Sequence, residues 1–371
     1  MSATNSQSGI NTDPEAGSQS RNRIETAQYF VGKTASLNIL KTSVQPDGQI
    51  IDWIPIESQG EIASPPPLPA FPFHPSPNTK VTSEPDCQQA TGPLFSLEME
   101  GAEKGPGGTV PILRQDLKLL SNKPTLTQRL SETAPSTKGK RKLQSMATLT
   151  IEVGWIIYPA QVAHPHSFTF FNTNGYTQIS DNKGGWNTEV KCWVQYDNTI
   201  SPGATIGPLC ADGGLQTIIP IKVPLHEGNW RVYVIDRWIR YYPASLFRTD
   251  VADPAQTLAQ GSDQVSWYGA VYQTDETLTS TNMGSGEWPW TRFTHSAFIK
   301  NITWIDADSI LHDYDGTQHS IVSDEEGYTM ETHYKSGFDW WQSYMWIGGP
   351  GAGGKIGAES ERTKDTEVEL L

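Results

Sequence analysis

One carboxylate lies in a run that is otherwise apolar. Glu152 belongs to LTIEVGWIIY, residues 149–158, in which it alternates with Leu149, Ile151 and Val153. A carboxylate that is buried in a strand must be paired, hydrogen-bonded or protonated, whereas one on a half-exposed strand simply points to solvent. A buried carboxylate with a second acid beside it is suited to general acid–base catalysis. Glu152 is therefore the best single candidate for chemistry.

The cysteines do not point to a metal or a redox cofactor. Cys87, Cys192 and Cys210 allow one disulfide at most and lack the spacing of metal ligands. We expect neither a metal nor a cofactor, and cysteine usage leaves the cellular compartment open.

The charge of the chain limits the classes of partner. Its 371 residues carry a formal net charge of -14, which disfavours binding to nucleic acid, because phosphate backbones are held by clustered Lys and Arg. No apolar run approaches the roughly 20 residues that cross a bilayer, so no membrane partner is expected. Residues 1–26 lack the basic start and apolar run of a secretory signal.

The elements that must position Glu152 are strands. From about residue 147 to 353 the chain alternates apolar and polar residues with a period of two and has many Gly, Pro, Asn and Asp residues between the runs. With 13 Trp, 13 Tyr and 11 Phe, this pattern predicts an all-β domain, an antiparallel β-sandwich of about ten strands, with one helical turn over 243–247. The runs include HSFTFFN, VKCWVQY, LQTIIPIKV, NWRVYVIDRWIRYY and VSWYGAVY.

The sequence before this domain divides into three parts. Residues 1–26 are polar and predicted to be disordered, and residues 121–146 form a polar, basic linker. Between them, residues 27–120 form a smaller β-rich region, in which a Pro46-Asp47-Gly48 turn precedes a strand over IIDWI. The prolines of SPPPLPAFPFHPSP, residues 64–77, favour an extended polyproline II segment, which is a surface strap or an inert linker. Residues 354–371 are predicted to be a disordered tail.

Several motifs, in order along the chain, resemble the neprosin-type glutamic peptidases. IEVGW followed by Tyr158-Pro159 is similar to the first catalytic segment of that family. Two segments near the N-terminus, SVQPDGQIIDWI and GGTVPILR, resemble its propeptide, so the region over 27–120 is propeptide-like. Further similar segments are WVQYDNTISPGATI, NWRVYVIDRWIRYYPASLF, VSWYGAVY, NMGSGEWP and WIGGPGAGG.

The resemblance implies a two-carboxylate mechanism on a β-sandwich. Enzymes of this family cleave peptides, typically after proline and at acidic pH, with one protonated and one ionised glutamate. Glu152 maps onto the first glutamate. The resemblance implies a peptide or protein substrate, with proline-rich chains as candidates, and a secreted enzyme, although the absence of a signal leaves the localisation unknown.

The second glutamate is missing from its expected place. Where the family has Gly-Glu-Val, this chain has Gly269-Ala270-Val271, and the alanine cannot transfer a proton. The nearest replacement is Glu287, expected on a neighbouring strand, unless it is an ordinary polar residue at a turn. Asp275 and Glu276 are further replacements. Three aromatic residues either line a cleft for a proline-containing peptide or belong to the core: Trp155, Tyr242 and Trp288.

Three functions remain open at this point. The first is an acid-acting glutamic endopeptidase made as a zymogen, with Glu152 and Glu287 as its acids. The second is a catalytically impaired homologue that binds peptides or glycans because Ala270 replaces the second acid. A carbohydrate-binding module ranks last, because it does not explain the propeptide-like motifs.

Overall fold

The chain is built from strands. The structure is a computed structural model, and its described part contains strands and single turns of 3-10 helix, which confirms the predicted all-β class. The described residues are 37–67, 101–114, 149–158, 162, 164–173, 184–187, 193–247, 257–271, 280–316, 322, 324–334 and 341–353. The predicted disordered end segments and the linker over 121–146 lie outside these ranges.

Three strands near the N-terminus form a separate small sheet. They are antiparallel in the order β1-β2-β3, with the bounds Lys41–Val44, Ile50–Pro55 and Thr109–Leu113. The predicted turn before β2 is present: the Gly48 N–H donates to the Gln45 carbonyl at 2.9 Å, and Gly48 has a φ of 85°. Only glycine adopts such a backbone readily. A 3-10 turn, η1 (Ile56–Gln59), follows β2.

A second sheet has the order β7-β11-β10-β8, with β9 also paired to β10. Along β10, Trp230, Val232 and Val234 point into the main core, so Arg231 and Tyr233 lie on the outer face. The predicted helical turn is confirmed as η2 (Ala244–Leu246). The strand bounds are Val194–Gln195, Ile221–Lys222, Leu225–His226, Asn229–Val234 and Arg237–Pro243 for β7 to β11.

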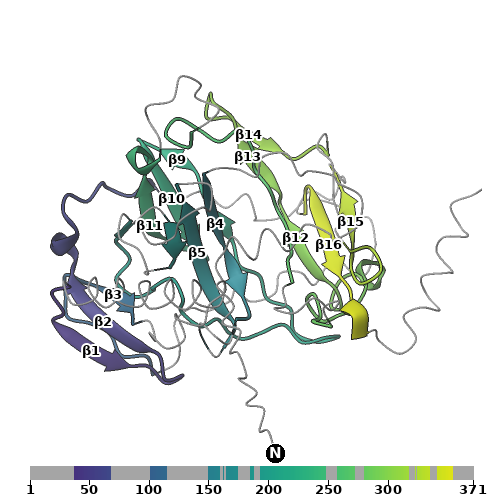
Figure 1. The fold of residues 1–371 in the computed structure, drawn as a ribbon, viewed down its shortest axis with the longest axis horizontal. Helices are drawn as coiled ribbons and strands as arrows, with labels where there is room; N and C mark the ends of the chain where they lie inside the picture. Colours follow the sequence, from purple (N-terminus) through teal and green to yellow (C-terminus); the bar gives the residue numbers. More distant parts are fainter. Residues whose placement is uncertain are drawn as a thin grey trace, which may run out of the picture.

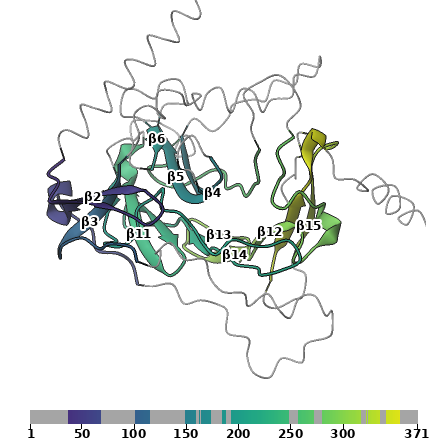
Figure 2. The same cartoon turned by 90° about the horizontal axis from the view of Figure 1, so that it is seen from below.

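The third sheet, β4-β5-β6, packs on the second through one core. Its strands are Thr150–Ile156, His166–Asn172 and Gly184–Trp186. Ile151, Val153 and Phe171 from this sheet contact the same apolar cluster as Val232 and Ile239 of the β7-β11-β10-β8 sheet. Figures 1 and 2 both show β4 and β5 lying beside β10 and β11 in the centre of the molecule.

The C-terminal part adds a further layer on the side away from β1 to β3 (Figures 1 and 2). Its sheet has the order β12-β16-β15, and a hairpin, β13 and β14, stands next to it. A dense aromatic cluster of Phe293, Trp341, Tyr344 and Trp346 fills its interior. The elements are Ala297–Lys300, Thr303–Ile305, Leu311–Asp313, Thr329–His333 and Tyr344–Gly348 for β12 to β16, with 3-10 turns η4 (Pro289–Thr291) and η5 (Gly351–Gly353).

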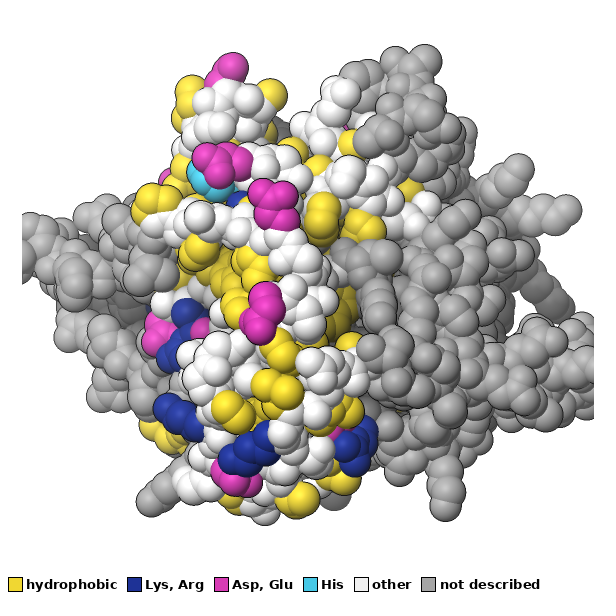
Figure 3. All heavy atoms as spheres, turned by 90° about the vertical axis from the view of Figure 1, so that its left-hand side faces the viewer, with side chains coloured by type: hydrophobic (Ala, Val, Ile, Leu, Met, Phe, Trp, Pro, Cys, Tyr) yellow, Lys and Arg dark blue, Asp and Glu magenta, His cyan; other side chains and the backbone are white. Residues whose placement is uncertain are grey.

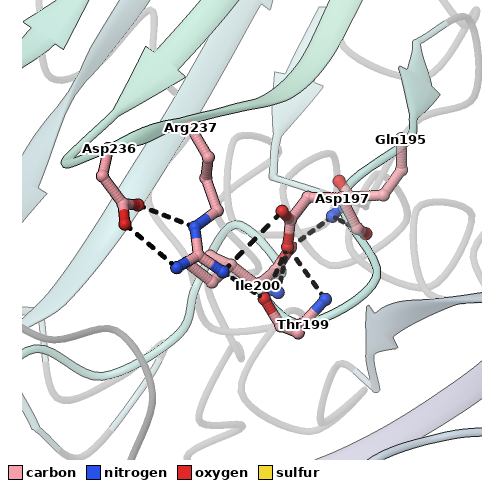
Figure 4. A network of polar contacts seen from close by, with 6 residues as sticks. All are labelled: Gln195, Asp197, Thr199, Ile200, Asp236 and Arg237. Carbon is pink, nitrogen blue, oxygen red and sulfur yellow. Dashed lines mark hydrogen bonds and ion pairs between the residues drawn. The ribbon is translucent and has the colours of Figure 1, made fainter. Parts of the chain in front are cut away.

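A polar network shapes the loop that follows β7. Figure 4 shows Asp197, whose carboxylate accepts the backbone N–H groups of Thr199 at 2.8 Å and Ile200 at 2.7 Å. Arg237, held by Asp236 at 2.7 Å, donates to the Thr199 hydroxyl, also at 2.7 Å. Because these bonds satisfy the backbone of a tight turn, they fix the direction of the chain after Ile200.

The small N-terminal sheet docks on the loop that this network positions. The Gln49 side chain donates to the Gly203 carbonyl at 2.7 Å, and the Thr205 hydroxyl donates to the Asp47 carboxylate at 2.8 Å. On the side of the molecule where β1 to β3 lie, hydrophobic, acidic and basic side chains are interspersed (Figure 3). The β1-β2-β3 sheet is therefore attached to the body by specific hydrogen bonds as well as by apolar contacts.

Candidate active site

Glu152 lies in the middle of β4, on the face of the sheet that points away from the main core. Its neighbours Ile151 and Val153 pack against that core, and side chains alternate along a strand, so Glu152 faces outward. The side chain is half-buried. The structure thus places the carboxylate between the two alternatives that its sequence allowed, neither sealed in the interior nor fully solvated.

Aromatic rings surround this carboxylate on the outer face. Phe170 on β5 lies directly opposite Glu152, and the Phe168 and Phe170 rings are each 5.2 Å from the ring of Trp186 on β6. The glycine at 154 leaves room for Phe168, because a Cβ atom there would lie 3.0 Å from the Phe168 ring. An apolar surrounding of this kind strengthens hydrogen bonds to a carboxylate.

A tyrosine from a distant part of the sequence binds this carboxylate. The Tyr268 hydroxyl donates a hydrogen bond to Glu152 Oε2 at 2.7 Å, although 54% of the tyrosine is exposed. A bond from a hydroxyl to a carboxylate favours the ionised form and fixes the orientation of its oxygens. Tyr268 is not among the site residues predicted from the sequence. The available signal was its place two residues before Ala270.

Tyr268 lies in VSWYGAVY, which was predicted to be a strand. The described residues of this segment do not form one. Residues 264–271 form no strand and have no ladder partner within the described ranges. Side chains hold the segment instead: the Trp267 ring lies 5.4 Å from Tyr314, and a Cβ atom on Gly269 would lie 2.7 Å from Ile347. Trp267 and Gly269 therefore face β16, and Tyr268 faces Glu152.

Ala270 lies two residues after Tyr268 and follows Gly269, which lies close to Ile347 of β16. The residue is exposed. An alanine at this position contributes no proton donor or acceptor, whereas the phenol two residues earlier does.

Glu287 is not on a strand, so the expectation of a neighbouring strand was wrong. It follows a turn in which the Gly286 N–H donates to the Met283 carbonyl at 3.1 Å, and its own N–H donates to the Ser285 hydroxyl at 3.1 Å. Two glycines with positive φ, at 284 and 286, favour this turn over a strand. Its role as the second acid stays a prediction. Asp275 and Glu276 lie outside the described residues.

The three aromatic candidates occupy different environments. Trp155 is 45% exposed, but it projects from the opposite face of β4 to Glu152. Tyr242 is fully buried in the main core, where its hydroxyl donates to Thr169 at 3.0 Å. Trp288 is buried and stacks on Trp290, with 5.1 Å between the ring centroids. Tyr242 and Trp288 thus take the core position that was their alternative.

No metal site is visible in the part of the chain that the structure describes, where no three His, Cys, Asp or Glu side chains are grouped to hold an ion. No helix within the same ranges is long and apolar enough to cross a membrane.

The arrangement around Glu152 can assist the attack of water on a carbonyl group. An ionised carboxylate accepts a proton from water, and a neutral phenol beside it donates a hydrogen bond to an oxygen that gains negative charge. Both groups lie on an accessible face, since Glu152 is half-buried and Tyr268 is exposed. The pair therefore offers one proton acceptor and one neutral donor.

Comparison with known protein families gives one match. The family model described as Neprosin matches residues 129–350, which is more than half of the chain. The matched stretch includes Glu152, Tyr268, Ala270 and Glu287.

Proposed function

The chain belongs to the neprosin family, and we propose that it is a glutamic endopeptidase that hydrolyses peptide bonds after proline at acidic pH. Family membership indicates a peptidase-type function. The observation that carries the proposal to particular residues is the 2.7 Å hydrogen bond from Tyr268 to Glu152 on the open face of the β4-β5-β6 sheet. We further propose that the propeptide-like region makes the chain a zymogen.

Glu152 acts as the general base in this proposal. Its ionised carboxylate takes a proton from a water molecule as the water oxygen attacks the scissile carbonyl carbon. The carbonyl double bond opens, and a tetrahedral intermediate forms with a negative oxygen. The protonated Glu152 then gives its proton to the amide nitrogen, the C–N bond breaks, and a carboxyl product and an amine leave.

Tyr268 stabilises the negative oxygen of the intermediate. Its single O–H donates to the ionised Glu152; once Glu152 has taken a proton from water, the hydroxyl turns to the developing oxyanion and donates to it. A phenol stays protonated at acidic and neutral pH, because its ordinary pKa is about 10. Tyr268 thereby supplies the neutral donor that a protonated second glutamate would supply.

The aromatic rings on the same face support a preference for proline. Phe168 and Trp186 are half-buried and lie next to the row formed by Glu152 and Phe170. A proline ring is apolar and rigid, so it packs well on such a surface. We propose that these rings, rather than the core residues Tyr242 and Trp288, contact the proline of the substrate.

Cleavage of a proline-containing peptide tests the proposal. At about pH 3 to 5, where glutamate ionises, Glu152→Gln should lower kcat/KM by at least about 100-fold, because an amide cannot accept the proton of water. Glu227→Gln is the matched control, since Glu227 lies exposed in the turn before β10. Equal cleavage by the unmodified chain and Glu152→Gln would show that Glu152 is not the base.

A second pair of variants tests which residue donates the hydrogen bond to the oxyanion. Tyr268→Phe keeps the ring but removes the hydroxyl, and we expect it to lower kcat more than Glu287→Gln does, by about tenfold or more. If Glu287→Gln abolishes activity and Tyr268→Phe leaves it unchanged, Glu287 is the second acid despite its position after a turn.

The position of Ala270 favours one other function. Alanine at this position lacks the second carboxylate of the family, so the alternative is an impaired homologue that binds peptides or glycans on this face. Titration of the unmodified chain with a labelled proline-containing peptide distinguishes the two. Saturable binding without any cleavage from pH 3 to 7 identifies the binding protein, whereas turnover that depends on Glu152 identifies the peptidase.

A further inference from the structure

The outer face of the β7-β11-β10-β8 sheet carries aromatic rings around one arginine. Arg231 on β10 and Trp238 and Tyr241 on β11 form this surface, which we call the aromatic face, together with Tyr233 and Tyr196. The Arg231 guanidinium lies 4.8 Å from the centre of the Tyr241 ring. An outer sheet face of this composition is unusual, because such a face normally carries polar side chains in water.

The chain itself covers the aromatic face with residues 59–67, which we call the strap. It begins at Gln59, whose side-chain amide pairs with the free edge of β7: Gln59 Nε2 donates to the Gln195 carbonyl at 2.6 Å, and the Gln195 N–H donates to Gln59 Oε1 at 2.8 Å. From there the strap runs through Glu61 and Ala63 to the prolines at 65–67.

The side chains of the aromatic face hold the strap by its backbone. The Ala63 N–H donates to the Tyr241 hydroxyl at 3.1 Å, and Arg231 Nη1 donates to the Ala63 carbonyl at 3.4 Å. The Trp238 indole N–H donates to the Pro67 carbonyl, also at 3.4 Å. Because these bonds reach backbone atoms, they select an extended chain rather than particular side chains of the strap.

Arg231 has more donors than the strap uses. Its side chain is fully buried, and its Nε and Nη2 atoms have no hydrogen-bond partner within the described residues. Burial also raises the pKa of the neighbouring Tyr196 hydroxyl well above its ordinary range, against the opposing charge of Arg231. A buried cation with unused donors is costly unless another oxygen meets them.

We propose that the aromatic face is a docking site for extended, proline-rich peptides and that the strap occupies it in the intact chain. The site is distinct from Glu152, because it lies on the far side of the other sheet. The proposal goes beyond the peptidase function and does not depend on it.

Polyproline II recognition explains the arrangement. A proline-rich segment is already extended and loses little entropy on binding, and it docks on aromatic rings while indole N–H groups donate to its carbonyls. The strap supplies three prolines over 65–67, and Trp238 supplies the indole. The unused donors of Arg231 would bind a further carbonyl or carboxylate oxygen of an external peptide.

The strap competes with such a peptide from within the same chain. A tethered segment acts at an effective concentration in the millimolar range, so an external peptide binds weakly while the strap is in place. Weakening the strap removes this competition and raises the apparent affinity for the external peptide by the same factor.

The test uses the full chain with Glu152→Gln, so that no peptide is cleaved. The probe is a fluorescent peptide with the sequence of residues 59–67, QGEIASPPP, and its control carries glycine in place of the three prolines. We expect the probe to bind a strap variant, with Pro65, Pro66 and Pro67 replaced by glycine, at least about tenfold more tightly than the chain with its own strap. Trp238→Phe in the strap variant should weaken binding by about threefold or more, whereas the matched Trp304→Phe, on β13 of a different sheet, should not.

Three results would overturn the proposal: equal binding of the probe with and without the strap, no effect of Trp238→Phe, or equal binding of the glycine control peptide. A dimer of the strap variant that buries Trp238 would also overturn it, by identifying a second copy as the occupant. If the strap variant fails to melt cooperatively, the unmodified strap is tested instead. Excess probe should then speed the cutting of residues 59–67 by an added protease, and an unchanged rate would refute the proposal.

Discussion

The two outer faces of the central layers differ in what covers them. On the β4-β5-β6 sheet, Glu152 is half-buried and its partner Tyr268 is 54% exposed. On the β7-β11-β10-β8 sheet, Arg231 is fully buried and Tyr241 is 3% exposed, under the strap. Both faces combine aromatic rings with charged groups, but one is accessible and the other is occupied by the chain.

The face that carries Glu152 is the candidate for catalysis, whereas the other face attaches the N-terminal region. The hydrogen bonds from Gln59 and Ala63 go to the β7-β11-β10-β8 sheet, while Glu152 lies on the other layer. A substitution on one face should therefore change hydrolysis without loosening the N-terminal region, and a substitution on the other should do the reverse.

The largest expected effect is on the open face. Ala270→Glu restores the second carboxylate of the family, and two neighbouring acids share a proton that one of them keeps at acidic pH. General acid–base catalysis contributes about 10² to 10⁴ in rate, so we expect kcat to rise by at least about 100-fold. The rate of cleavage of a proline-containing peptide measures this.

Ala270→Gln is the control for that substitution. It has the size of glutamate but cannot exchange a proton, so it should give no comparable gain. An equal gain with both variants would mean that the effect is one of shape, and no gain with either would place residue 270 outside the site.

The second prediction compares two buried arginines of one sheet. Arg240 points between the layers, where it donates to the Asn187 carbonyl at 2.6 Å, to Thr169 at 3.1 Å and to Gln195 at 3.3 Å. Burial lowers its pKa. Arg240→Ala leaves these acceptors unsatisfied and opens a cavity, so it should lower the free energy of unfolding by about 3 kcal/mol or more.

Arg231→Ala removes a side chain of similar size from the covered face and should cost less, because its one hydrogen bond to the strap is weak. Chemical denaturation of both variants gives the two values. Equal losses would contradict the distinction between an arginine that joins the layers and one that faces a removable segment.

A smaller effect on stability is expected for Asp52, which joins the strands of the N-terminal sheet. Asp52 is buried, and its carboxylate accepts Arg114 Nε at 2.8 Å and the Thr42 hydroxyl at 2.7 Å. Asp52→Asn removes the charge and should lower the stability of β1 to β3 by about 1 to 2 kcal/mol. Faster amide hydrogen exchange in these strands, with unchanged exchange in β4, would register the change.

Asp308→Asn serves as the matched control, because Asp308 is exposed in the turn between β13 and β14, where a substitution should change stability little. If the two substitutions speed exchange in β1 to β3 equally, Asp52 has no special role in holding that sheet.

The smallest effect concerns Lys300 on β12. Burial lowers its pKa to about 8, so its charged form destabilises the fold below that pH. As pH rises from about 8 toward the unfolded value near 10, the folded chain loses the proton first and stability increases. Lys300→Met removes the group, so its advantage in Tm over the unmodified chain should shrink between pH 7 and 10. If the difference in Tm between the two proteins stays constant from pH 7 to 10, the charge of Lys300 does not destabilise the fold.

The sequence predicts the fold well where local patterns decide it. The Pro46-Asp47-Gly48 turn and the strand over IIDWI both follow from turn chemistry and period-two alternation. These features depend on neighbours in the chain. They could be predicted before any tertiary contact was known.

The rest depends on contacts between distant segments. Tyr268 meets Glu152 across 116 positions of sequence, and no local pattern marks that contact. The segment 264–271 has the composition of a strand but is held by side chains instead of backbone pairs. Both faces of β11 carry aromatic residues, so the sequence alone does not say which face is buried. The packing of the β4-β5-β6 sheet on β11 places Tyr242 in the core.

The coupling between Glu152 and Tyr268 tests the central claim most directly. A double-mutant cycle compares kcat/KM for a proline-containing peptide in the unmodified chain, Glu152→Gln, Tyr268→Phe and the double variant. If the two groups act as one unit, the double variant is no slower than Glu152→Gln alone, because a donor without its base contributes little. If the two factors by which the single substitutions lower kcat/KM simply multiply in the double variant, the claim is contradicted. Tyr268 then acts independently of Glu152.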